Sequence, residues 1–276
     1  MSAPVTRESR GSRATGQVVS PVRAVLFAVD NHWLWYRRNW RATVFSSLIS
    51  PALFLVALGF GFGSQVTAGP ITGGLPYVEY LAPALLVAAT VQNAAWESTY
   101  AVLGSFKWQR VYWAVAATPL TPGQIAVGQI AWIAVRVGLV GAAFVVVAAA
   151  LGTLTSPLGV LALPVAIVAA LALSAPIVAY SATVNDEGQK FNAIFRFVVM
   201  PMTLFAGIYY PVEQLPAVVR PIAWLTPVWH GTELARGVSF GGLSWWAGLG
   251  HLAFLIALVV AGTAFAVRNY RRRLAA

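Results

Sequence analysis

The amino-acid sequence predicts an all-α integral membrane protein with six transmembrane helices. Hydrophobic residues make up 59% of the 276-residue chain and charged residues only 9%, whereas a soluble domain carries about 25% charged residues. Six apolar runs reach the roughly 20 residues that a helix needs to cross a bilayer. No large soluble domain is therefore expected beside the spans.

The N-terminal 41 residues are expected to lie on one side of the membrane. Residues 1–20 are polar, contain arginines and lack the apolar core of a cleavable signal peptide, so they predict a disordered cytoplasmic tail. In residues 21–41, apolar and aromatic side chains recur at alternating spacings of four and three and cover one helical face. Three tryptophans and Tyr36 suit the headgroup zone, which favours an interfacial helix leading into the first span.

The six predicted spans account for most of residues 42–267. Pro51 is expected to kink the first span. An uncharged loop rich in glycine and proline follows the first span, and the last span runs into a basic cytoplasmic tail at 268–276. The spans are expected at about 42–63, 77–103, 122–151, 158–184, 191–210 and 245–267.

Residues 211–244, between the fifth and sixth spans, are the least regular part of the chain. Four prolines divide this region into apolar pieces that are too short to cross a bilayer. We therefore expect two re-entrant or interfacial half-helices, at about Leu215–Leu225 and Val228–Val238.

The distribution of positive charge predicts the orientation. Fourteen of the 18 lysine and arginine residues lie in the two terminal segments and in the loops after the second and fourth spans. The intervening loops contain only Arg220 and Arg236. Because cytoplasmic segments are enriched in lysine and arginine, both termini are expected in the cytoplasm. The net charge of +10 is thus explained by membrane topology, and no nucleic-acid partner is expected.

The loop between the second and third spans, residues 104–121, is the most informative stretch. It carries two cations and several apolar residues at helical spacing, which predicts a short amphipathic helix on the cytoplasmic membrane surface. Pro119 ends this helix, and Thr121 with Gln124 forms a capping box that starts the next span. The candidate residues of the helix are Phe106, Lys107, Trp108, Arg110, Val111, Tyr112 and Val115. An ordinary connecting loop and a docking helix for a cytosolic partner both fit this pattern.

Arg136 lies near the middle of the third predicted span. An arginine at that depth costs about 2.5–3.5 kcal/mol on insertion scales, so such a residue normally faces a bundle interior or an aqueous path. Glu97, in the inner half of the second span, is the nearest candidate partner. The pair can line a translocation pathway or serve helix packing alone, and the sequence leaves both alternatives open.

No motif typical of an enzyme occurs in the sequence. The chain has no cysteine, which excludes disulfides and thiolate metal sites. Neither lysine follows a glycine-rich loop, so there is no phosphate-binding loop of the Walker type. The histidines at 32, 230 and 251 are scattered, with no second metal ligand in register. We therefore expect no catalytic, cofactor-binding or metal-binding residue on this chain.

Several motifs resemble the permease subunits of type-2 ABC exporters. The resemblance covers nearly the whole chain after residue 30 and is nearest to the nodulation-type lipo-oligosaccharide and daunorubicin-type drug exporter permeases. The motifs are Tyr80-Leu-Ala-Pro-Ala84, Glu97-Ser-Thr-Tyr100, Trp113-Ala-Val-Ala-Ala-Thr-Pro-Leu-Thr121, Gly128-Gln-Ile-Ala-Trp132, Pro201-Met-Thr-Leu-Phe-Ala-Gly207, Tyr210-Pro-Val-Glu-Gln-Leu-Pro216 and Leu225-Thr-Pro227.

This resemblance implies an architecture and a set of partners. It implies an N-terminal elbow helix at residues 21–41, a coupling helix in the first cytosolic loop, and re-entrant extracellular helices before the last span. Two permease subunits, identical or different, would pair in the cell membrane, in contact with its lipids, with two copies of a cytosolic ATPase that binds ATP and Mg²⁺. The re-entrant loop would include Tyr210, Pro211, Glu213, Leu215 and Pro216.

The function implied is ATP-driven export of an amphiphilic or lipid-linked substrate by a subunit that is not itself an enzyme. Relatives move lipo-oligosaccharides, polysaccharide-lipids, glycolipids or hydrophobic drugs, and drug export would connect the chain to antibiotic resistance. Two alternatives remain open at this stage. One is a membrane enzyme acting on lipids, for which the sequence offers only Glu97 and Arg136. The other is a membrane anchor or sensor that does not transport.

Overall fold

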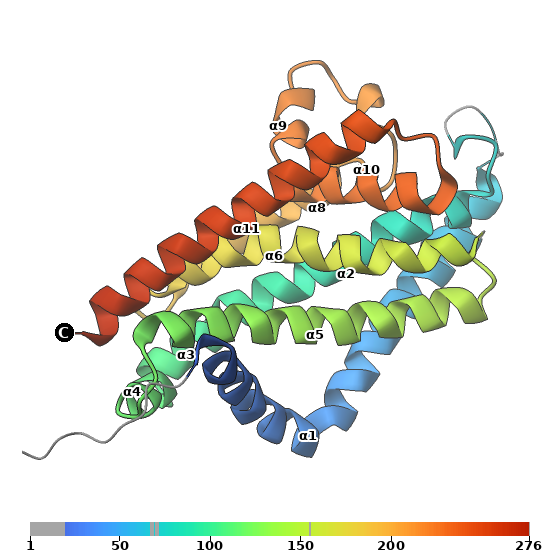
Figure 1. The fold of residues 1–276 in the computed structure, drawn as a ribbon. Helices are drawn as coiled ribbons and strands as arrows, with labels where there is room; N and C mark the ends of the chain where they lie inside the picture. Colours follow the sequence, from blue (N-terminus) through green and yellow to red (C-terminus); the bar gives the residue numbers. More distant parts are fainter. Residues whose placement is uncertain (1–19, 67–68, 70–71, 155, 276) are drawn as a thin grey trace, which may run out of the picture.

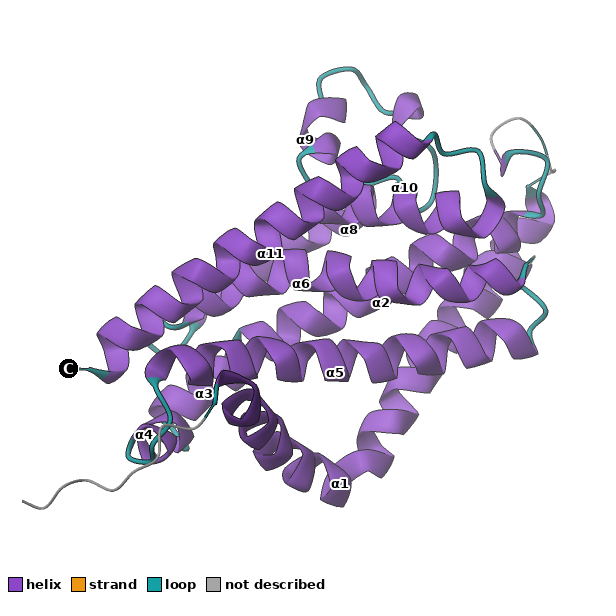
Figure 2. Ribbon diagram, in the orientation of Figure 1, coloured by secondary structure: helices purple, strands orange, loops and turns teal. Residues whose placement is uncertain are grey.

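The chain folds into a bundle of α-helices, and no strand occurs among the residues that the structure describes (Figure 2). The computed structural model describes residues 20–66, 69, 72–154 and 156–275. The all-α prediction is confirmed for this part of the chain. The expected disordered tail at 1–20 lies outside the described residues, apart from Ser20.

Helices of several types follow one another along the chain (Figure 1). The α-helices are α1 (Pro21–Phe54), α2 (Tyr77–Ser98), α3 (Tyr100–Lys107), α4 (Val111–Ala116), α5 (Pro122–Ala150), α6 (Ala162–Ser181), α7 (Gln189–Ile194), α8 (Met200–Phe205), α9 (Arg220–Trp224), α10 (Pro227–Phe240) and α11 (Trp245–Leu274). Segments of π-helix are Leu55–Gly61 and Phe195–Val199, and 3-10 turns occur at Phe62–Gln65, Pro157–Leu161 and Val212–Gln214.

Three helices in the described part of the chain are long and apolar enough to cross a membrane, namely Pro122–Ala150, Pro157–Ser181 and Trp245–Leu274. They coincide with the third, fourth and sixth predicted spans. The first, second and fifth predicted spans change helix type or break within the structure. The six-span topology therefore stays a prediction.

Helix α6 occupies the centre of the bundle and packs against α2, α5, α10 and α11. It is rich in alanine, which lets neighbouring helices approach closely, as is common between membrane helices. Helix α11 approaches α6 closely at Gly262, where an added Cβ would lie 2.5 Å from the backbone nitrogen of Pro176 in α6. Any larger residue at 262 would push α11 away from the core.

Helix α1 begins where the interfacial helix was expected and continues to Phe54 without interruption. Figure 1 shows it as two limbs that meet in a sharp bend. The helix packs along α5, and a Cβ at Gly128 of α5 would lie 2.4 Å from the Cβ of Ala28. The first limb is therefore docked on the bundle, and its expected place at a membrane surface stays a prediction.

The predicted second span does not run continuously to residue 103, because α2 ends at Ser98. The hydroxyl groups of Ser98 and Thr99 donate to the carbonyl oxygens of Ala94 and Ala95, at 2.6 and 2.9 Å. Such bonding to the preceding turn bends helices. The hydroxyl of Ser181 donates to the freed carbonyl of Ser98 at 2.7 Å, which compensates the break.

The helix boundaries in the C-terminal part of the chain also differ from the predicted ones. The fifth span was expected to reach residue 210, but α8 ends at Phe205 and the chain turns at Gly207, whose φ of +77° suits glycine. Helix α11 extends beyond the predicted end of the sixth span at residue 267 and reaches Leu274, and its last turns are hydrogen-bonded to the bundle. The cytoplasmic location of the basic segment 268–276 stays a prediction. In the irregular region, α10 matches the second predicted half-helix, whereas α9 is much shorter than the first.

Candidate functional site

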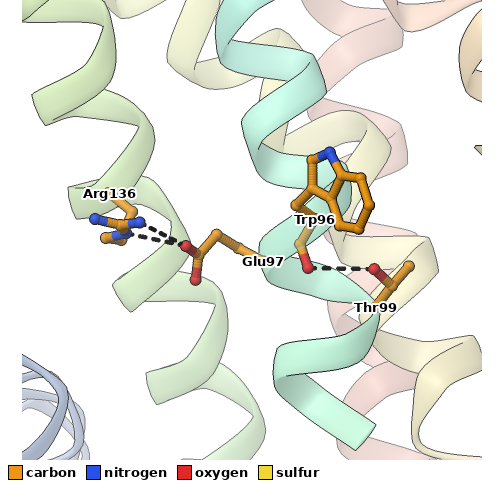
Figure 3. A network of polar contacts seen from close by, with 4 residues as sticks. All are labelled: Trp96, Glu97, Thr99 and Arg136. Atoms are coloured by element: carbon orange, nitrogen blue, oxygen red, sulfur yellow. Dashed lines mark hydrogen bonds and ion pairs between the residues drawn. The ribbon is translucent and has the colours of Figure 1, made fainter. Parts of the chain in front are cut away.

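Arg136 of α5 and Glu97 of α2 form an ion pair between neighbouring helices (Figure 3). The Nε and Nη2 atoms of Arg136 donate to Oε1 of Glu97 at 3.0 and 2.8 Å. Both side chains are largely shielded, with 12% and 19% of their surfaces exposed. The structure thus brings together the two residues that were expected to pair, and their role in a pathway stays a prediction.

The first limb of α1 covers one side of this pair. The guanidinium carbon of Arg136 lies 4.8 Å from the centre of the Tyr36 ring, which is close enough for a cation–π interaction. One turn away, His32 stacks on Trp132 of α5 with ring centres 5.3 Å apart. The ion pair therefore lies where α1, α2 and α5 meet.

The loop after α2, which was expected on the cytoplasmic side, is folded as two short helices rather than the single amphipathic helix that was predicted. Helix α3 ends at Lys107, and α4 begins at Val111. Arg110 has a φ of +53° and is the one non-glycine residue with positive φ in the described part of the chain. The left-handed backbone conformation of this residue turns the chain between the two helices. We call residues 100–116 the connector.

Two of the predicted docking residues face inward, which corrects the expectation that they meet a partner. Phe106 and Tyr112 are buried, and their rings pack edge to face at a centre distance of 4.7 Å. Tyr270, near the end of α11, completes the cluster at 4.9 Å from Phe106 and 5.3 Å from Tyr112. Helical spacing could not distinguish a face turned to a partner from a face turned to a distant helix of the same chain.

The outer side of the connector is exposed. Trp108 and Trp113 have 55% and 41% of their surfaces exposed, Arg110 is also exposed, and Val111 and Val115 are partly buried. A groove of about 610 Å³ opens beside them. Its lining residues are Phe106, Lys107, Arg110, Trp113, Asn185 and Arg273.

The connector is also bound to the loop that follows α6. Lys107 forms an ion pair with Glu187, which lowers the pKa of the Glu187 carboxyl group. Asp186 pairs with Lys190 at 3.3 Å. The two cytoplasmic loops expected from the charge pattern therefore lie side by side.

A hydrogen bond joins the connector to α5. The Tyr112 hydroxyl donates to Oε1 of Gln129 at 2.8 Å, and burial raises the pKa of Tyr112 to about 12, so the hydroxyl keeps its proton. The predicted capping box at the start of α5 is confirmed. The backbone N–H of Gln124 donates to the Thr121 hydroxyl at 3.3 Å, and the backbone N–H of Thr121 donates to the side-chain oxygen Oε1 of Gln124 at 2.8 Å.

The predicted re-entrant residues lie in the segment between α8 and α9, where Tyr210 and Leu215 pack into one small hydrophobic cluster. Tyr210 donates through its hydroxyl to the Leu204 carbonyl at 3.2 Å, and Pro211 precedes the 3-10 turn that contains Glu213. Leu215, just before Pro216, is buried against Val212 and Ala223. These residues shape the turn between α8 and α9, and their depth in a membrane stays a prediction.

Arg236 of α10 lies between the fifth and sixth predicted spans, within the second predicted half-helix, and its side chain is only 11% exposed. Its Nη1 and Nη2 atoms donate to the carbonyl oxygens of Gly207 and Ile208 at 2.8 and 2.9 Å, and its guanidinium lies 3.9 Å from the ring centre of Tyr80. It therefore links the turn that follows α8 to α10. The only sequence signal was an arginine between short apolar pieces, which does not distinguish burial from exposure.

Two histidines that looked unrelated in sequence are in contact. Nδ1 of His230 in α10 lies 2.8 Å from Nδ1 of His251 in α11. Within the described residues, no group of three or more His, Asp or Glu side chains is placed to hold a metal ion. The pair is a polar contact between two helices.

Comparisons with known proteins agree on one family. Residues 23–240 match the family described as ABC-2 type transporter. Nodulation protein J of Rhizobium leguminosarum bv. viciae is 32% identical over 226 residues, which cover 79% of this chain and 86% of the relative. Nodulation protein J of Rhizobium meliloti (strain 1021) is 28% identical over 255 residues, which cover 88% and 95%.

The apolar helical bundle and these matches define a membrane permease component of an ABC transporter. The chain belongs to the ABC-2 type transporter family.

Proposed function

We propose that this permease subunit exports an amphiphilic or lipid-linked substrate from the cytoplasm or the inner leaflet of the cell membrane. Two copies of a separate ATPase, which bind ATP and Mg²⁺, drive the transport, and a second permease subunit completes the assembly. Both termini face the cytoplasm. Glycolipids, lipo-oligosaccharides and hydrophobic drugs are the substrate classes that follow from the resemblance described above.

The connector is the observation that carries this proposal. Its inner face is fixed to the bundle through Phe106 and Tyr112, while Trp108 and Trp113 on its outer face are exposed. Exposed aromatic residues are frequent anchors at protein interfaces. A soluble ATPase that binds the outer face would therefore act on a segment that is attached to membrane helices.

The groove beside the connector adds a charge pattern. Lys107, Arg110 and Arg273 contribute cations to its lining. Such cations favour acidic groups on a partner and increase the rate of association more than the affinity. The Glu97–Arg136 pair braces α2 and α5, the two helices that the connector joins in sequence.

Reconstitution separates this function from that of an anchor or sensor. We would purify the chain with its co-expressed ATPase, reconstitute the complex in vesicles, and measure ATP hydrolysis with added glycolipids or hydrophobic drugs. Stimulation by one amphiphile, together with its ATP-dependent movement across the vesicle membrane, is expected. A complex that hydrolyses ATP but is stimulated by no amphiphile and moves none would contradict export.

A further inference from the structure

The C-terminal end of α11 is packed on the connector (Figure 1). The side chain of Tyr270 is fully buried, and its ring contacts both Phe106 and Tyr112. Aromatic pairs at these distances contribute beyond simple burial of area. A residue near the end of the last helix therefore lies at the centre of the cluster that holds the connector.

The same end of α11 is also bound to α6 and to Phe106. The guanidinium carbon of Arg273 lies 4.2 Å from the centre of the Phe106 ring, and its Nη1 atom donates to the Ala182 carbonyl at 2.9 Å. Asn269 donates to the Ala179 carbonyl at 2.8 Å. These contacts bind the last two turns of α11 both to the connector and to the end of α6.

The connector also follows α2 directly in the chain and contacts α5 and α6. Toward α2, the helix is interrupted at Thr99 between α2 and α3. Toward α5, the chain passes through the loop at 117–121, and one hydrogen bond joins Tyr112 to Gln129. By contrast, α11 is one uninterrupted helix of 30 residues, with the cluster near its C-terminal end. A continuous packed helix can carry a displacement along its length.

We propose that Tyr270 is a positioning residue that transmits movement of the connector into α11, so that the last helix responds when the ATPase acts. This inference rests on the proposed function. It adds a third helix to the two that the connector joins in sequence. It assigns the transmission to Tyr270, whose ring contacts both Phe106 and Tyr112, whereas Arg273 contacts the Phe106 ring.

The Tyr270 hydroxyl provides a matched control. This hydroxyl is buried and makes no hydrogen bond of standard geometry among the described residues, although it lies near the Tyr112 hydroxyl. The ring makes the aromatic contacts with Phe106 and Tyr112. Tyr270→Phe keeps the ring and its aromatic contacts and removes only the hydroxyl, so it separates the role of the ring from that of the hydroxyl. Tyr270→Leu keeps an apolar side chain but removes the ring contacts, and it leaves a smaller cavity than Tyr270→Ala.

The chain contains no cysteine, so single reporter cysteines can be labelled without background from this subunit. Trp245→Cys reports on the end of α11 opposite Tyr270, and Ala150→Cys reports on the corresponding end of α5. Both positions are exposed. In membranes that contain the chain and its ATPase, we would compare maleimide labelling rates without nucleotide and after trapping with ATP, Mg²⁺ and vanadate.

Trapping is expected to change the labelling rate of Trp245→Cys by roughly twofold or more. Tyr270→Phe should preserve this change, and Tyr270→Leu should remove it while the change at Ala150→Cys persists. An equal response at Trp245→Cys in the Leu and Phe variants would overturn the inference, as would loss of response at both reporters in the Leu variant. If trapping changes neither reporter in the chain with Tyr270 intact, the proposed ATP-driven function fails as well.

Discussion

The Nε and Nη2 atoms of Arg136 donate to the same carboxylate oxygen, Oε1 of Glu97, at 3.0 and 2.8 Å. The contact joins α5 to α2 where few other charges occur, and the Tyr36 ring lies 4.8 Å from the guanidinium carbon. Two opposite charges in a shielded site stabilise each other, but each is costly without its partner.

Replacing only one partner should therefore be worse than replacing both. We expect Arg136→Leu to leave the protein inserted but to lower the free energy of unfolding by about 3 kcal/mol and to impair export. Adding Glu97→Gln should restore part of the lost stability and part of the lost export. Thermal unfolding in detergent measures stability, and transport into vesicles of the amphiphile that best stimulates ATP hydrolysis measures export.

Arg196→Leu is the matched control, because Arg196 is an exposed arginine in the π-helical segment Phe195–Val199. Its effect on stability should be small. Normal export by Arg136→Leu would remove the functional role of the pair, and a double variant no better than Arg136→Leu would remove the mutual dependence.

The orientation can be tested with reporters at the two ends of the bundle. A reporter fused after Ala276 should behave as cytoplasmic, since the arginines at the end of α11 follow the positive-inside rule. A reporter inserted near Gly241, in the turn between α10 and α11, should be external. The same location for both reporters would contradict the six-span topology.

The exposed face of the connector should contact the ATPase. Single cysteines at Trp108 or Trp113 are expected to cross-link to the co-expressed ATPase subunit, with a yield that changes with nucleotide. Tyr112→Cys is the control and should not cross-link, because this position is buried. Cross-linking from residues 185–190 but from neither tryptophan would place the docking surface on the other cytoplasmic loop.

A charge on the partly buried side of α4 should separate ATP hydrolysis from transport. We expect Val115→Asp to leave the subunit in the membrane and to permit ATP hydrolysis. Export per ATP should fall, because the charged side chain prevents the connector from packing against the bundle. Val115→Ile is the conservative comparison. Unchanged export per ATP in Val115→Asp would show that this side of the connector does not transmit movement.

Arg236 should contribute strongly to stability. Arg236→Met would remove two charge-assisted hydrogen bonds and leave the carbonyl groups of Gly207 and Ile208 without these donors, so we expect the free energy of unfolding to fall by about 3 kcal/mol. Arg220→Met is a useful comparison, because Arg220 also donates to two carbonyl groups but lies closer to solvent. Equal losses in thermal unfolding experiments would show that burial does not determine the effect.

The sequence by itself determined the class of fold and where several of the long helices begin, among them α1, α2, α5 and α11. The low content of charged residues and the long apolar runs require a membrane environment, and the capping box at Thr121 and Gln124 depends only on residues three apart. The approach of Arg136 to Glu97 was also foreseeable, since an arginine within an apolar span needs a partner.

The tertiary structure decided which distant segment packs against each apolar helix face. The sequence showed an amphipathic segment around Phe106 and Tyr112, but only the fold places Tyr270, more than 150 residues away in sequence, against both rings. The same holds for Arg236 and for the contact of His230 with His251. Helical periodicity records that one side of a helix is apolar, whereas burial depends on which distant segment packs against that side.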